Sequence, residues 1–217
     1  MLKARRHRAT EGGGLLTVDE SWEKVERWLA RYAPEDQLPG PAGRDDIARL
    51  SDQAGIRLPP DVEQSLLRHN GSGLVTVVPP GFVLYGAEEI ARSYTEWHVL
   101  KSDEPVYVPI GSLGPLEMTV DTRTGCIGSY DPVQGYVRDD DPLGASFSAL
   151  LAFVADALDS SPPWIAMLPG EEEWEATYED ADFPGTLSWT DEPDGPADWD
   201  MSSLNRQFGF IDDGDGS

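Results

Sequence analysis

The chain has 217 residues, of which 39% are hydrophobic, and a formal net charge of −24 at pH 7. A charge of this sign disfavours nucleic acid and anionic membranes, which attract cations, and it favours basic protein partners. The single cysteine, Cys126, excludes an internal disulfide, and no stretch approaches the roughly 20 apolar residues of a membrane span. We therefore expect a cytoplasmic protein that binds neither membranes nor nucleic acid.

Charge and apolar periodicity divide the chain into three predicted parts. Residues 1–16 form a flexible basic leader, in which four basic residues stand against Glu11 alone. Residues 17–160 show the apolar periodicity of a folded domain. Residues 161–217 carry fifteen acidic residues against Arg206 alone, together with four tryptophans. We expect this last part to be an acidic, tryptophan-rich extension that is irregular and partly disordered.

Helices dominate the first part of the predicted domain. Thr17 and Glu20 have the spacing of a capping box, and the apolar face that follows them ends at Pro34. A second helix is predicted over residues 44–54, with Gly55 as its stop. A third helix begins at Pro60, because proline suits the first helical turn.

The third helix runs into the segment 58–73, LPPDVEQSLLRHNGSG. His69 is spaced to lie on the same face as Val62 and Leu66. Asn70 and Gly71 are residue types that tolerate the left-handed conformation closing a helix. We interpret His69 as a helix-terminal side chain satisfied by local carbonyls. The alternative, a nuclease-type histidine base, needs further metal-binding histidines that the sequence lacks.

Beyond residue 73 the apolar period changes towards that of a strand. Strands are predicted over residues 74–78, 82–86, 106–110, 116–120, 126–130 and 135–139, with a helix over 87–98 and a last helix over about 146–158. Residues 121–125 have the composition of a hairpin turn. The order predicts an α+β fold: N-terminal helices packed on a central, mostly antiparallel sheet of about five to six strands, then a closing C-terminal helix and an irregular acidic tail.

Tests for catalytic chemistry find no complete motif. The sequence has no G-x-S-x-G, no H-E-x-x-H, no paired C-x-x-C and no phosphate-binding loop. Cys126 is predicted to be a small buried hydrophobe inside a strand. We therefore expect no catalytic residue, no metal and no cofactor. An enzyme of unrecognised type that uses Asp121, Asp139 and His98 is the alternative, and it requires these groups to converge.

The helical segments resemble a known family, the SUKH superfamily, which contains the Smi/Knr-type regulators of cell-wall synthesis. The resemblance covers residues 20–158 and includes the helix SWEKVERWLARYAP. Its most specific part is the block from Leu58-Pro59 to Asn70-Gly71, similar to the family pattern LP-x-D…L-x-x-x-NG. The resemblance implies an α+β fold without enzymatic activity. The residues interpreted as structural are Trp22, Leu58, Pro59, His69, Asn70 and Gly71.

The resemblance also implies a function in protein binding. Many bacterial members are thought to be immunity proteins that neutralise toxins, whereas fungal members act as adaptors in cell-wall signalling. We interpret the chain as a non-catalytic binding module, foremost an immunity protein against a basic nuclease- or deaminase-type toxin domain. The alternative is a regulatory adaptor with an endogenous partner, and the oligomeric state is left open. The candidate partner contacts combine aromatic anchors with acids: Tyr130, Tyr136, Asp139, Asp140, Asp141, Trp174 and Trp189.

Overall fold

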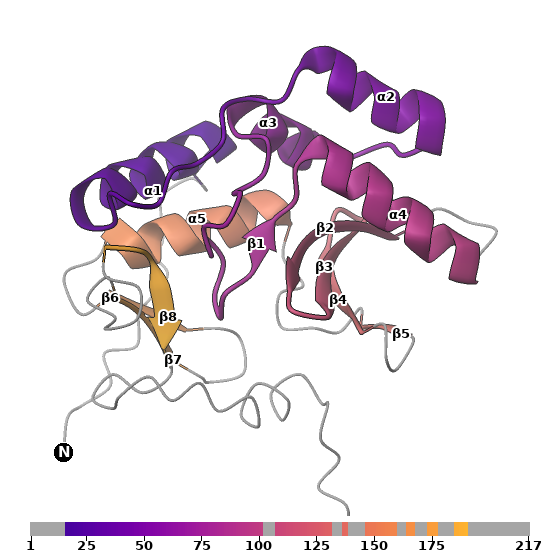
Figure 1. The fold of residues 1–217 in the computed structure, drawn as a ribbon. Coiled ribbons are helices and arrows are strands. Elements are labelled where there is room, and N and C mark those ends of the chain that lie inside the picture. The colour runs from indigo at the N-terminus through magenta and orange to yellow at the C-terminus, as the bar shows by residue number, and fades with distance from the viewer. Residues whose placement is uncertain are drawn as a thin grey trace, which may run out of the picture.

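A computed structural model describes residues 16–101, 107–131, 136–138, 146–159, 164–167, 173–177 and 185–190. The predicted leader, apart from Leu16, lies outside these ranges, as do the acidic residues at 139–141 and everything after residue 190. Figure 1 shows helix α1 lying alongside α5, and α4 lying across the larger of two sheets. Within the described residues, no helix has the length and apolar character needed to cross a membrane.

Five helices are described, and four of them lie close to their predicted positions. They are α1 (Val18–Tyr32), α2 (Arg44–Ala54), α3 (Pro60–Arg68), α4 (Ala87–Lys101) and α5 (Phe147–Asp159), of which α4 extends furthest beyond its prediction. The capping box of α1 is confirmed: the Glu20 amide donates to the Thr17 hydroxyl at 3.2 Å, and the Glu20 carboxylate accepts from the Thr17 amide at 2.8 Å.

The larger sheet has five strands in the order β1-β2-β3-β4-β5, and every neighbouring pair is antiparallel. The strands are β1 (Val83–Leu84), β2 (Tyr107–Leu113), β3 (Leu116–Asp121), β4 (Ile127–Asp131) and β5 (Tyr136–Arg138). The predicted turn joins β3 to β4, where the Gly125 amide donates to the Asp121 carbonyl at 2.7 Å. The α+β fold with a central antiparallel sheet is confirmed.

Two sequence predictions in this region are wrong. Residues 74–78 form no strand; their described pairing is one isolated bridge, between Val78 and Phe82. The amides of Val75 and Val77 donate instead to nearby carbonyls within this loop, while both side chains stay buried. A buried loop can therefore show the same alternation of apolar residues as a strand. Cys126 lies just before β4 and is exposed, so it is not the buried small hydrophobe expected.

The predicted irregular tail contains a second sheet. Its strands are β6 (Trp164–Met167), β7 (Glu173–Thr177) and β8 (Ser188–Thr190), which pair antiparallel in that order. Leu187 and Trp189 belong to the main hydrophobic core, with exposed fractions of 3% and 1%. Part of the acidic extension is therefore regular, and its residues 185–190 complete the core of the preceding domain.

Candidate protein-interaction site and its structural motif

His69 follows the last residue of α3 and joins three segments of the chain. Its Nδ1 lies 2.7 Å from the Pro39 carbonyl oxygen, and its Nε2 lies 2.7 Å from Glu26 Oε1 on α1. Because a carbonyl can only accept, Nδ1 carries a proton and donates it to Pro39. The ring also meets Trp22 edge-on, with centroids 4.8 Å apart. The carbonyl that satisfies His69 is thus distant in sequence, not local as expected.

Arg68 and Glu26 form the charged part of the same joint between α3 and α1. Two nitrogens of the Arg68 guanidinium, Nε and Nη2, each donate to the Glu26 carboxylate at 2.8 Å. These bonds from Arg68 hold the pKa of Glu26 below its usual range, against the opposing effect of burial, and His69 adds to the lowering. Beside them, Trp22 Nε1 donates to Ser65 Oγ at 3.0 Å. These hydrogen bonds join α1 to α3.

Asn70 and Gly71 connect the end of α3 to the start of α4. Asn70 Oδ1 accepts from the amide of Ala87, the first residue of α4, at 2.9 Å, so this side chain caps the next helix. Gly71 has a φ of +78°, as predicted for a left-handed residue. A Cβ there would lie 2.5 Å from the Gly86 nitrogen and 2.6 Å from the Leu84 carbonyl oxygen. Only glycine fits both the conformation and the close approach.

The N-terminal part of the motif positions α3 against the core. Pro59 is the buried N-cap residue of α3, and Leu58 packs partly buried against the core. Asp61 Oδ2 then accepts from the Ser148 amide in the first turn of α5 at 2.9 Å. The polar groups of the block from Leu58 to Gly71 thus hold α1, α3, α4 and α5 in place, which agrees with a structural role.

The candidate partner contacts divide between the two sheets: Tyr130 and Tyr136 lie on the paired strands β4 and β5, whereas Trp174 and Trp189 lie on the paired strands β7 and β8. Tyr130 and Trp189 are only 3% and 1% exposed, so the expectation that they anchor a partner at the surface is corrected. Tyr136 lies in β5 opposite Asp131, and Trp174 lies in β7 opposite Ala166. The run from Asp139 to Asp141 lies outside the described residues. Aromatic residues among acids occur in buried strands as well as at interfaces, so the sequence could not separate the two.

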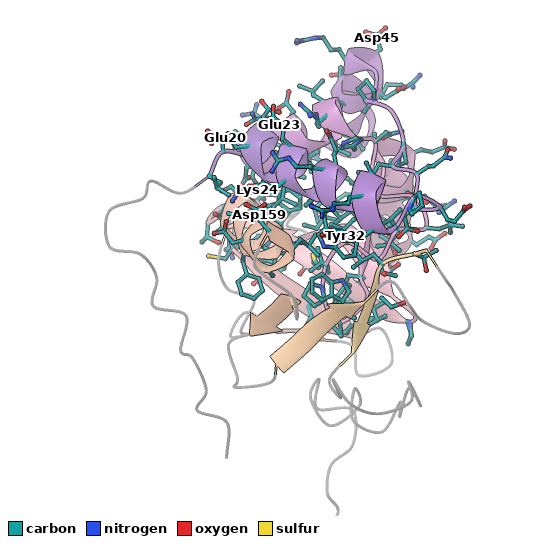
Figure 2. The ribbon with its side chains drawn as sticks, turned by 90° about the vertical axis from the view of Figure 1, so that its left-hand side faces the viewer. Glu20, Glu23, Lys24, Tyr32, Asp45 and Asp159 are labelled. Atoms are coloured by element: carbon teal, nitrogen blue, oxygen red, sulfur yellow. The ribbon has the colours of Figure 1, made fainter. Side chains whose placement is uncertain are left out.

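Four exposed acidic residues lie on the neighbouring helices α1 and α3. We call this set the acidic α1–α3 face, and its members are Asp19, Glu20, Glu23 and Glu63. Gln64 Nε2 donates to Asp19 Oδ2 at 2.9 Å and so connects the two helices. Figure 2 shows Glu20 and Glu23 near the start of α1, with Lys24 close to Asp159 of α5. The sequence signal for this face was the set of acids at the polar positions of each helical period.

Other acids share the cations that lie beside the acidic α1–α3 face, so these cations compensate the face only in part. Lys24 Nζ lies 2.8 Å from Asp156 Oδ1 and 3.3 Å from Asp159 Oδ2, both on α5. Arg68 pairs with Glu26. Lys24 also attracts Glu20, and Arg68 also attracts Asp19 and Glu23. An acidic surface that is only partly compensated still attracts basic partners and accelerates their association.

The residues of the enzyme alternative are not shown to converge. Burial raises the pKa of Asp121, but hydrogen bonds from Arg123, 3.1 Å away, outweigh it and hold that pKa below its usual range. Asp139 and the side chain of His98 lie outside what the structure describes. Within its described part, the chain has no group of three or more histidine, cysteine or acidic residues placed to hold a metal ion.

Comparison with known proteins gives two curated relatives, while no protein-family model matches. A "Glucan synthesis regulatory protein" of Neurospora crassa is 33% identical over 105 residues, which are 45% of this chain and 20% of that protein. A "KNR4/SMI1 homolog" of Yarrowia lipolytica is 34% identical over 86 residues, 37% of this chain and 12% of that protein. The matches thus span a fifth or less of the relatives' length. Over less than half of its length, the chain is therefore similar to a glucan synthesis regulatory protein and to a KNR4/SMI1 homolog.

Proposed function

We propose that the chain is a regulatory protein-binding module without catalytic activity that acts in the cytoplasm. The observation that carries this proposal is its similarity to the Neurospora crassa protein, which is named for regulating glucan synthesis and not for a reaction it catalyses. Regulation of cell-wall glucan synthesis is the most specific form of the proposal. It ranks above the toxin-neutralising interpretation, because the Neurospora crassa relative is named as a regulatory protein and neither relative is named for a toxin.

The structure supports the proposal through the roles of its polar residues. The motif residues His69 and Asn70 are used in joining helices, and Asp121 is paired with Arg123. The acidic α1–α3 face is exposed and only partly compensated by Lys24 and Arg68, and it suits a partner with a basic surface. The expected complex therefore forms quickly and weakens as salt screens the charges.

Affinity enrichment of the full chain from its own cells tests this function. The wild type should retain one specific protein at about 50 mM salt and release it at about 500 mM. A doubly reversed variant, Glu23→Lys with Glu63→Lys, should lose that protein. The matched control, Asp52→Lys with Glu96→Lys, changes two exposed acids on α2 and α4 and should keep it. Absence of any specific partner at either salt concentration would contradict the proposal.

Neutralisation of a toxin is the second candidate, and the net charge of −24 favours it. Enzymes that grip nucleic acid carry basic surfaces, which an acidic protein can cover. Co-expression with the product of the neighbouring gene tests this candidate. A salt-sensitive complex that also relieves growth arrest supports it, whereas arrest that persists without any complex rejects it.

A further inference from the structure

Residues 185–190, which we call the strap, lie outside the part of the chain that resembles the SUKH superfamily. Leu187 and Trp189 are nevertheless as buried as the centre of the domain, at 3% and 1% exposure. Both belong to the hydrophobic core cluster of the described residues, which also includes Ala33, at the end of α1, and Val75 and Val77 of the loop before β1. We call the place that the strap takes in this core the slot.

Hydrogen bonds fix the strap along the loop after α1 and the loop before β1. Trp189 Nε1 donates to the Thr76 carbonyl at 2.8 Å, and Thr76 Oγ1 donates to the Leu187 carbonyl at 2.9 Å. The Leu187 amide donates to Asp36 Oδ2 at 2.6 Å, and the Glu35 amide donates to the Gly185 carbonyl at 3.3 Å. The slot thus recognises both the main chain and the indole of an extended segment.

The strap is held by loops and not by the five-stranded sheet. Its only described strand partner is β7, in the separate three-stranded sheet. The strap can therefore leave the slot without breaking a ladder hydrogen bond of the larger sheet. A segment that opens separately from the rest of the core exchanges its amides at a lower free energy than the core does.

We propose that the slot is a peptide-binding site for extended segments of the pattern Leu-x-Trp, and that the strap is its intramolecular ligand. Leucine and tryptophan occupy the apolar floor, while Asp36 and Thr76 pair with the main chain and the indole. The strap keeps the site closed, and a segment of the same pattern from another protein competes with it. This inference does not depend on the regulatory function proposed above.

Hydrogen exchange on the full chain tests whether the strap opens separately. Amides of residues 185–190 should exchange at least about tenfold faster than those of α5. Asp36→Ala should raise the exchange rate of the strap by about a further tenfold and leave the exchange rate of α5 unchanged. Glu35→Ala is the control, because only the main chain of Glu35 bonds the strap. Exchange of the strap and α5 at one common rate would overturn the proposal.

Peptide binding to the full chain tests the slot itself. A labelled peptide of residues 183–192 should bind the Trp189→Ala chain at least about tenfold tighter than the wild type, whose slot is already filled. The same peptide with alanine in place of tryptophan should bind neither chain. The proposal is overturned if the Trp189→Ala chain folds cooperatively and does not bind the peptide. So does a Trp189→Ala chain that no longer folds, because the slot then does not exist without its strap.

Discussion

Gly71 is the residue whose replacement the structure penalises most clearly. Gly71→Val places a β-branched side chain at a φ of +78° and a Cβ within 2.7 Å of three backbone atoms. We expect a loss of about 3 kcal/mol in the free energy of unfolding, from backbone strain and overpacking together. Urea denaturation measures it. The control is Gly125→Ala, where φ is +76° but no atom lies within 4 Å, and it should cost only about 1 kcal/mol.

Asn70 provides a second prediction at the scale of one side chain. Asn70→Ala removes the acceptor for the first amide of α4 and should lower the free energy of unfolding by about 1 kcal/mol. Asn70→Asp keeps an acceptor and adds a negative charge at a helix N-terminus, so it should stay close to the wild type. Equal losses in the two variants would show that the cap is not what Asn70 contributes.

Residue types alone predicted part of this picture. The left-handed conformation of Gly71 can be predicted from the sequence, because a glycine stands just after a helix and few other residues adopt that conformation. The partner of His69 did not follow, since nothing local indicates that Pro39 and Glu26 fold onto it. Trp189 was assigned to a surface because acids surround it in sequence, yet burial depends on contacts from distant loops.

Among the elements, α1 and α3 depend on the pair formed by Glu26 and Arg68. The pKa of Glu26 is lowered in the folded state. Its ionised form therefore stabilises the fold fully at pH values above 4.5, the ordinary pKa of a glutamate. That contribution is lost as pH falls through the lowered pKa. Glu26→Gln should therefore cost about 1 kcal/mol at neutral pH and progressively less below about pH 4.5.

Urea denaturation of the wild type and of Glu26→Gln between pH 7 and pH 3 measures this difference in the free energy of unfolding. Glu23→Gln is the control, because the Glu23 side chain is exposed and lies on the same helix. It should change the stability by less than about 0.5 kcal/mol throughout. A deficit of Glu26→Gln that is the same at every pH would show that lost packing, and not charge, causes it.

Elements with a marked period and a capping signal were predicted best. α1 has both, and its bounds follow Thr17 and Pro34 closely. The loop 74–78 was predicted as a strand because its valines alternate, but its amides bond locally and leave no ladder. β8 was missed because three residues give too short a period to detect.

For the whole molecule, the net charge of −24 governs how stability responds to salt. The described ion pairs of Lys24 are on partly exposed side chains and contribute little, whereas repulsion between acids acts throughout. The thermal midpoint should therefore rise by a few degrees between about 10 mM and about 300 mM sodium chloride. Differential scanning calorimetry measures it. A midpoint that falls with salt would mean that attractive pairs outweigh repulsion.

The central claim is that the chain acts by binding a basic protein partner and not by catalysis. Isothermal titration of the enriched partner with the full chain tests it most directly. We predict that Kd rises at least about tenfold between about 50 mM and about 300 mM salt, and again by about tenfold with Glu23→Lys and Glu63→Lys. Asp52→Lys with Glu96→Lys should leave Kd unchanged. A Kd that responds neither to salt nor to reversal of the acidic α1–α3 face would contradict the account.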